Sequence, residues 1–179
     1  MAVEDVLGAQ RLAATAQTLG LTPTFETVPL GGHINLNRPN LVIICGPRLS
    51  TTIGATLDTD PNLRFVRAPD GPWTLRDTTT GTIYRSGLDD QPARPHDVAY
   101  LGRLKRPDGR GRLMIFTGIH PQGSLGVVHL LCTQLADLHK EVHDRDFSVL
   151  VGTEYDPGSG EPQRVELLTP IYLHDEIID

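Results

Sequence analysis

The sequence contains little cysteine, few aromatic residues and no long apolar run. Two of its 179 residues are cysteines, and both Cys45 and Cys132 lie within short apolar stretches. Two thiols in such surroundings are typical of small buried side chains in a reducing compartment, not of a disulfide framework. Aromatic residues make up only 5% of the chain, yet the hydrophobic share of 39% is ordinary for a globular domain. The composition therefore predicts a conventional hydrophobic core.

No apolar stretch approaches the roughly 20 residues that a membrane-spanning helix needs. The first residues also lack the basic and then apolar pattern of a secretory leader. We therefore expect a cytoplasmic protein with no membrane partner. The net charge of −6 argues against a broad nucleic-acid surface, which requires a cationic face, so no direct nucleic-acid partner is expected. We interpret the basic run at 103–112 as a solvated hairpin.

A chain of 179 residues is long enough for one domain with its own core. We predict a single α/β domain over residues 1–179, with an N-terminal helix within 1–20 and a core over 41–173. Apolar residues recur at helical spacing from Glu4 to Leu19, and Gly20 is placed to end that helix.

The most informative pattern is a pair of apolar runs, each followed by a glycine-containing loop and a helix-like segment. The first run, 41–45, leads into a loop that supplies Gly46, Pro47, Arg48, Ser50 and Thr51. The second run, 113–117, leads into a loop that supplies Gly118, His120, Gly123 and Ser124. In open α/β sheets, such loops form a ligand crevice at the carboxyl ends of the strands. Helix N-termini at that edge present free N–H groups to anions.

These patterns predict an α/β fold of the three-layer, Rossmann-like kind: an open sheet with a mainly parallel core. Its core strands are expected at the runs that begin near residues 41, 98, 113 and 147. The segments 73–77 and 82–85 are joined by a Thr-Thr-Thr-Gly turn, which predicts a β-hairpin at one edge of the sheet. The segment Pro-Asp-Gly-Arg-Gly at 107–111 is a strong turn signal.

Each polar candidate in the two loops has a binding interpretation and a structural one. Arg48 either binds a carboxylate or phosphate with its guanidinium fork or pairs with Asp58 or Asp60. His120 either donates to a phosphate and carries protons or is held by backbone hydrogen bonds in a tight turn. Ser124 either bonds a bound anion or only caps the helix.

Two carboxylates near the strand ends also have two interpretations. Glu154 follows the run at 147–152, where it either binds ribose hydroxyls, or acts as a base, or is simply solvated. Asp97 lies just ahead of the run at 98–104, where it either anchors the two loops or caps a turn.

The sequence lacks the motifs of the common cofactor and metal sites. There is no G-x-G-x-x-G fingerprint and no Walker loop, so we predict no cofactor. The segment Gly123-Ser-Leu-Gly126 misses the G-x-S-x-G nucleophile elbow by one position. His139 and His143 have metal-ligand spacing but no clear third ligand, so no metal site is predicted.

Three stretches carry successive motifs: a strand that ends in Gly-Pro, a central segment that begins with Asp, and a strand that ends in Gly-Ile-His. They are Ile44-Cys-Gly-Pro-Arg48, Asp97-Val-Ala-Tyr-Leu-Gly-Arg103 and Thr117-Gly-Ile-His-Pro-Gln-Gly-Ser124. Over about residues 40 to 170 the chain resembles an uncharacterised family of bacterial Rossmann-like regulatory-protein domains. Members are often attached to a helix-turn-helix or another signalling module, which implies a sensory role. This chain has Arg-Leu-Ser at 48–50 where the family commonly has an asparagine-containing turn, and Pro-Gln at 121–122 where a glycine often follows the histidine.

The leading functional prediction is a non-catalytic sensory or ligand-binding domain for a small anionic, nucleotide-like ligand in bacterial signalling. One alternative is an enzyme, a hydrolase or transferase, that acts on a nucleotide or N-glycoside with Glu154 or His120 as acid and base. The other alternative is a protein-interaction module with a degenerate pocket. Its expected partners are a second copy of the chain or a regulatory protein.

Overall fold

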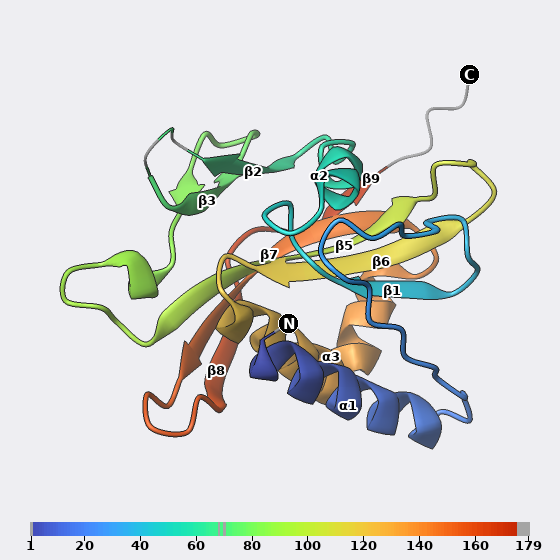
Figure 1. The fold of residues 1–179 in the computed structure, drawn as a ribbon, viewed down its shortest axis with the longest axis horizontal. Coiled ribbons are helices and arrows are strands. Elements are labelled where there is room, and N and C mark those ends of the chain that lie inside the picture. The colour runs from blue at the N-terminus through green and yellow to red at the C-terminus, as the bar shows by residue number, and fades with distance from the viewer. Residues whose placement is uncertain (1, 68, 70, 175–179) are drawn as a thin grey trace.

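The computed structural model describes residues 2–67, 69 and 71–174 and is built around a six-stranded sheet (Figure 1). Its strands are β1 (Leu41–Ile44), β5 (His96–Lys105), β6 (Arg112–Gly118), β7 (Asp146–Tyr155), β8 (Pro162–Leu167) and β9 (Tyr172–His174). A smaller sheet consists of β2 (Leu63–Arg67), β3 (Trp73–Asp77) and β4 (Ile83–Tyr84). The helices are α1 (Val3–Thr18), α2 (Thr51–Leu57), α3 (Pro121–Val142) and the short 3₁₀ helix η1 (Gly87–Asp89).

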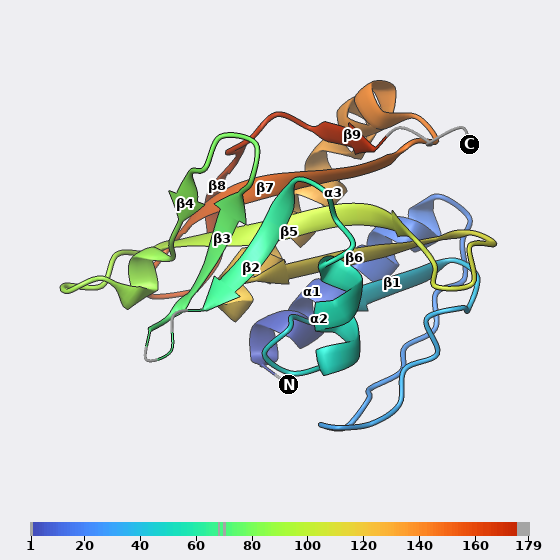
Figure 2. The same cartoon turned by 90° about the horizontal axis from the view of Figure 1, so that it is seen from above.

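The elements form layers on the two faces of the large sheet. Helices α1 and α3 lie on one face, and α2 and the small sheet lie on the other (Figures 1 and 2). Successive residues of a strand point to opposite faces, so β5 contributes to both cores. Leu101 is buried in the same cluster as Val128 of α3, whereas Tyr100 is buried in the same cluster as Leu75 of β3.

The predicted Rossmann-like, mainly parallel core is wrong. The order of the large sheet is β1-β6-β5-β7-β8, with β9 also paired to β7. Among the described strands only β1 and β6 pair in parallel, with Leu41 opposite Leu113 and Ile44 opposite Phe116. The other recorded pairs in this sheet are antiparallel, so the sheet is mixed and mostly antiparallel. A buried strand has the same apolar pattern whether it runs parallel or antiparallel to its neighbours. The apolar runs therefore could not indicate the strand directions.

Strands β6 and β7 nevertheless run in the same direction. Both are antiparallel to β5, which lies between them, and α3 connects them. This arrangement is a split β-α-β unit. Because β1 is parallel to β6, the carboxyl ends of β1, β6 and β7 all lie at the same end of the strands of this sheet.

The predicted edge hairpin lies elsewhere. Strands β3 and β4 do pair in antiparallel fashion, with Leu75 opposite Tyr84, but they belong to the small sheet. That sheet covers a face of the large one, because Leu75 is fully buried in a core shared with Tyr100. The hairpin therefore covers a face of the large sheet and does not extend that sheet at its edge.

Helix α1 lies within the range predicted from the sequence and is followed by Gly20, whose φ is +77°. It packs on α3, where the hydroxyl of Thr15 donates to the sulfur of Cys132 at 3.0 Å. Within the described ranges, no helix combines the length and the apolar content needed to cross a bilayer.

Candidate functional site

The two glycine loops meet at the edge where β1 and β6 end. Parallel pairing places Ile44 beside Phe116, so the residues after each strand emerge side by side. They border a hollow of about 40 Å³. Six of the ten predicted site residues line this hollow: Gly46, Pro47, Arg48, Gly118, His120 and Ser124.

A larger hollow of about 180 Å³ adjoins the first. The two share the wall residues Arg48, Trp73, Ile119 and His120. The larger one is also bordered by Arg67 of β2 and Asp89 of η1. We call the two hollows together the β1–β6 cleft. Sequence reasoning missed Arg67, Trp73 and Asp89, because the small sheet and η1 reach the cleft only through tertiary folding.

Two guanidinium groups face this cleft. Arg48 is exposed and makes no hydrogen bond or ion pair with any described residue. Its alternative partner Asp60 is fully buried and bonded elsewhere. Arg67 lies with its guanidinium 5.9 Å from the ring centre of Trp73, and its Nε donates to the carbonyl of Gly71 at 3.4 Å. Within the described ranges neither arginine makes an ion pair with a carboxylate, although Asp5 borders the small hollow and interacts electrostatically with Arg48. Each guanidinium group can therefore still bind an external anion.

Trp73 forms part of the wall that the two hollows share. Its ring borders both hollows, and its indole Nε1 is buried with no hydrogen-bond partner among the described residues. A buried N–H without a partner is costly, because it has lost its water without regaining a hydrogen bond. The rings of Trp73 and Phe65 of β2 form a T-shaped pair, with ring centres 6.3 Å apart and an angle of 74° between their planes.

Two carboxylates hold His120. Its ring Nε2 lies 3.0 Å from Oδ1 of Asp89, and its backbone N–H donates to Oδ2 of Asp97 at 3.0 Å. About a quarter of each partner's side chain is exposed, 27% for His120 and 23% for Asp89, so the pair is accessible from the cleft. The structural interpretation of this histidine is confirmed, since a hydrogen bond of its backbone fixes it at the cleft wall, and the binding interpretation stays a prediction.

The side chain of Asp97, a residue of β5, accepts hydrogen bonds from backbone N–H groups at the N-terminus of α3. Its Oδ2 also accepts from the backbone N–H of Gly123 at 2.7 Å. The side chain is fully buried, and burial raises the pKa of this carboxyl to about 6, against the lowering effect of its hydrogen bonds. Its other oxygen, Oδ1, is buried and has no hydrogen-bond partner among the described residues, and the same holds for the hydroxyls of Thr153 and Tyr155. The helix end that we expected to bind a ligand therefore already holds a carboxylate of the protein.

The glycines of α3 allow the helix to approach the sheet. A Cβ on Gly123 would lie 2.7 Å from Oδ2 of Asp97, and one on Gly126 would lie 1.8 Å from Oγ1 of Thr153. Gly123 lines neither hollow. The glycine spacing that suggested close approach to a ligand thus reflects close approach of α3 to β5 and β7.

The remaining predicted site residues lie outside the cleft or act within the protein. Ser50 caps α2, accepting from the backbone N–H of Ile53 at 3.3 Å, and Thr51 is an exposed residue of α2. Ser124 lines the small hollow, but its hydroxyl accepts from the N–H of Gly118 at 3.0 Å. Glu154 is exposed near the end of β7, 3.9 Å from Arg164, and borders neither hollow.

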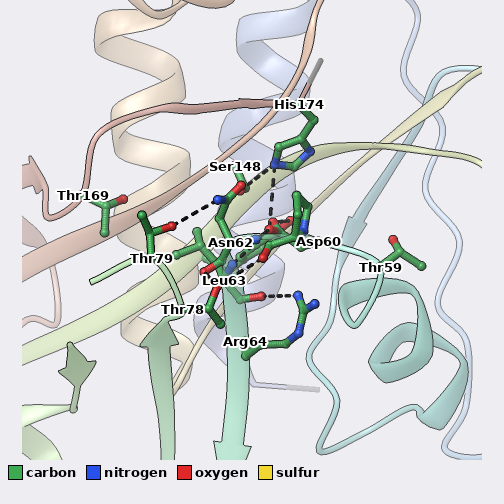
Figure 3. A network of polar contacts seen from close by, with 12 residues as sticks. Thr59, Asp60, Asn62, Leu63, Arg64, Thr78, Thr79, Ser148, Thr169 and His174 are labelled. Carbon is green, nitrogen blue, oxygen red and sulfur yellow. Dashed lines mark hydrogen bonds and ion pairs between the residues drawn. The ribbon is translucent and has the colours of Figure 1, made fainter. Parts of the chain in front are cut away.

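A second polar cluster gathers around Asp60, just ahead of β2 (Figure 3). Asp60 is fully buried, and its Oδ1 accepts from the backbone of Asn62 and Leu63 at 2.7 and 3.0 Å. Tyr100 donates to its Oδ2 at 2.8 Å, and burial raises the pKa of this phenol well above its usual value.

This cluster brings together a serine, a histidine and an aspartate. Ser148 Oγ lies 3.0 Å from His174 Nε2, and Asp60 Oδ1 lies 3.8 Å from the same nitrogen. A catalytic triad instead uses the two different ring nitrogens, one for the serine and one for the carboxylate. Ser148 is also fully buried. The cluster therefore joins β9, β7 and the start of β2 and does not present a nucleophile.

No group of three or more potential metal ligands gathers in the described parts of the chain. No protein-family model, curated protein or solved structure matches this chain. The resemblance to bacterial regulatory domains accordingly stays a prediction from its motifs.

Proposed function

We propose that the chain is a non-catalytic ligand-binding domain, the sensory part of a regulatory protein, that takes a small anion into the β1–β6 cleft. The observation that carries this proposal is the convergence of Arg48, Arg67 and His120 on one hollow of about 180 Å³. Guanidinium groups bind carboxylates and phosphates with strong, charge-assisted hydrogen bonds. The ring of Trp73 adds an aromatic wall to the same hollow.

The size of the cleft supports a small ligand. A buried water needs on the order of 10–15 Å³ of such space, so 180 Å³ holds on the order of ten non-hydrogen atoms. A phosphate, a small carboxylic acid or a sugar phosphate fits within that volume. A nucleotide would place its phosphate between the arginines and leave its base outside the hollow.

Trp73 makes the proposal testable without a label, because it is the only tryptophan of the chain. Fluorescence titrations at low ionic strength should compare inorganic phosphate, sulfate, succinate and adenosine monophosphate. We expect saturable changes with at least one of these anions. Arg48→Ala should weaken that binding about tenfold, because it removes a charged hydrogen-bond donor.

Arg164→Ala is the matched control, since this arginine pairs with Glu166 on β8, outside the cleft. It should bind the anion as the unmodified protein does. The absence of a saturable response to every anion would refute the proposal. If the protein then formed a stable oligomer, an interaction module would be the better explanation.

The His120–Asp89 pair favours a second candidate, an enzyme that uses His120 as general acid and base. An imidazole held by a carboxylate at the wall of a cleft is a common acid–base arrangement. No serine or cysteine among the described residues is hydrogen-bonded to this imidazole, so water would be the nucleophile. This candidate predicts hydrolysis of a nucleotide or N-glycoside that is lost in His120→Ala, whereas a binding domain leaves the ligand intact.

A further inference from the structure

Asp89 places a carboxylate in the larger hollow, beside the cationic side chains of Arg48 and Arg67. Its side chain borders the larger hollow with Arg48, Arg67 and His120. Its Oδ1 lies against the imidazole of His120, and its Oδ2 makes no hydrogen bond with any described residue. The cleft therefore presents both a cationic side and an acceptor.

The position of Asp89 is fixed by the fold. Asp89 ends η1, where its backbone N–H donates to the carbonyl of Ser86 at 3.3 Å. The hydroxyl of the fully buried Ser86 accepts from the N–H of Leu88 at 3.2 Å and donates to the carbonyl of His96 at 3.2 Å. These bonds tie the 3₁₀ turn to the start of β5. Asp89 is thus a built-in part of the cleft wall.

A carboxylate at this position disfavours a ligand that is only an anion. Like charges in one partly enclosed site repel, which lowers the affinity for a bare phosphate or carboxylate. A ligand with an amino or hydroxyl group offsets this repulsion, because that group donates a charge-assisted hydrogen bond to the free oxygen of Asp89.

We infer that the ligand is a small acid that also carries a hydrogen-bond donor, an amino or hydroxyl group, and that Asp89 selects for that group. The inference rests on the proposed anion site. The arginines would hold the acid group, and Asp89 would hold the donor. Amino acids, hydroxy acids and sugar phosphates of on the order of ten non-hydrogen atoms belong to this class.

The test uses three acids that differ in one substituent. Propionate, lactate and alanine share a three-carbon acid and carry hydrogen, hydroxyl or ammonium on the carbon next to the carboxylate. Titrations followed by Trp73 fluorescence should show lactate or alanine binding at least about fivefold more tightly than propionate. The preferred compound identifies whether the donor is a hydroxyl or an ammonium group.

Asp89→Asn removes the charge and keeps an oxygen that can accept from His120. In this variant we expect propionate to bind more tightly and the preference for the donor-bearing acid to shrink. Asp90→Asn is the control, because Asp90 pairs with Arg94 at 2.6 Å and does not border the larger hollow. A residue that only positioned His120 would not improve propionate binding when its charge was removed.

Two results separate this inference from the proposed function. If inorganic phosphate binds and the three acids bind equally, or if Asp89→Asn leaves their order unchanged, Asp89 does not select the ligand, although the anion site stands. If neither phosphate nor any of the acids binds, the anion site itself is wrong.

Discussion

The carboxylate of Asp97 and the backbone N–H of Gly123 are joined by a hydrogen bond of 2.7 Å that links the start of β5 to the first turn of α3. The same oxygen accepts from the backbone of His120. One buried side chain therefore fixes both the helix end and the loop that carries the histidine to the cleft. The anion at this helix N-terminus is a residue of the protein.

Asp97→Asn should change how stability depends on pH. The pKa of Asp97 is raised to about 6 in the folded protein, against 3.8 for the ordinary carboxyl. The folded state therefore binds the proton on the Asp97 carboxyl more tightly than the unfolded state does. The resulting stabilisation is fully present below pH 3.8 and is lost as the pH rises through about 6. From pH 7 to pH 4 the unfolding free energy of the unmodified protein should rise, relative to the variant, by up to about 3 kcal/mol.

Chemical denaturation at several pH values measures this difference. Asp144→Asn, at an exposed carboxylate, is the control and should follow the unmodified protein. A constant difference between Asp97→Asn and the unmodified protein across this range would show that Asp97 is not proton-linked to folding.

Gly126→Ala should destabilise the protein by at least about 2 kcal/mol. The new Cβ would lie 1.8 Å from the hydroxyl oxygen of Thr153, so α3 must move away from β7. Gly8→Ala in α1 would meet the side chains of Val128, at 3.2 Å, and Leu125, at 3.9 Å, and should change stability by less than about 1 kcal/mol.

Thermal and urea unfolding of both glycine variants provide the measurement. Adding Thr153→Ala to Gly126→Ala should recover part of the loss, because it removes the closest atom. Equal stability of Gly126→Ala and Gly8→Ala would mean that α3 does not pack closely against β7 at Thr153.

Tyr100→Phe should lower the free energy of unfolding by about 1.5–3 kcal/mol, because it removes the donor to a buried carboxylate oxygen of Asp60. Tyr84→Phe removes a hydroxyl that donates to the carbonyl of Leu168 at 3.2 Å from a partly buried position, and should cost less. Urea unfolding compares the two. Equal losses would indicate that Asp60 finds another donor when Tyr100 is changed.

The sequence predicted local features of the site better than the sheet that supports them. The motifs after 44 and 117 indicated two strand ends with glycine loops, and both loops border the cleft because β1 and β6 are parallel neighbours. The turn at 107–111 was also visible, and it joins β5 and β6 as an antiparallel hairpin. A tight turn at this place implies that β5 and β6 run antiparallel. The apolar runs, by contrast, led to the prediction of a mainly parallel sheet.

The far wall of the cleft could not be predicted from local patterns. Trp73 and Arg67 are adjacent in the small sheet, where they form a pair across β2 and β3. Nothing in their neighbouring residues indicates that this sheet folds over the ends of β1 and β6. Asp97 was recognised as a turn-capping carboxylate or loop anchor, yet its partners on α3 lie 23 and 26 residues away in the sequence.

The indole N–H of Trp73 offers the most direct test of the anion site. As the only tryptophan, it gives a single indole signal in a nitrogen–proton correlation spectrum of labelled protein. On titration with inorganic phosphate, we expect this signal to move saturably in the unmodified protein and to respond far more weakly in the Arg48→Ala, Arg67→Ala double variant. A signal that stays in place at high phosphate, or that moves equally in both proteins, would contradict anion binding in the β1–β6 cleft.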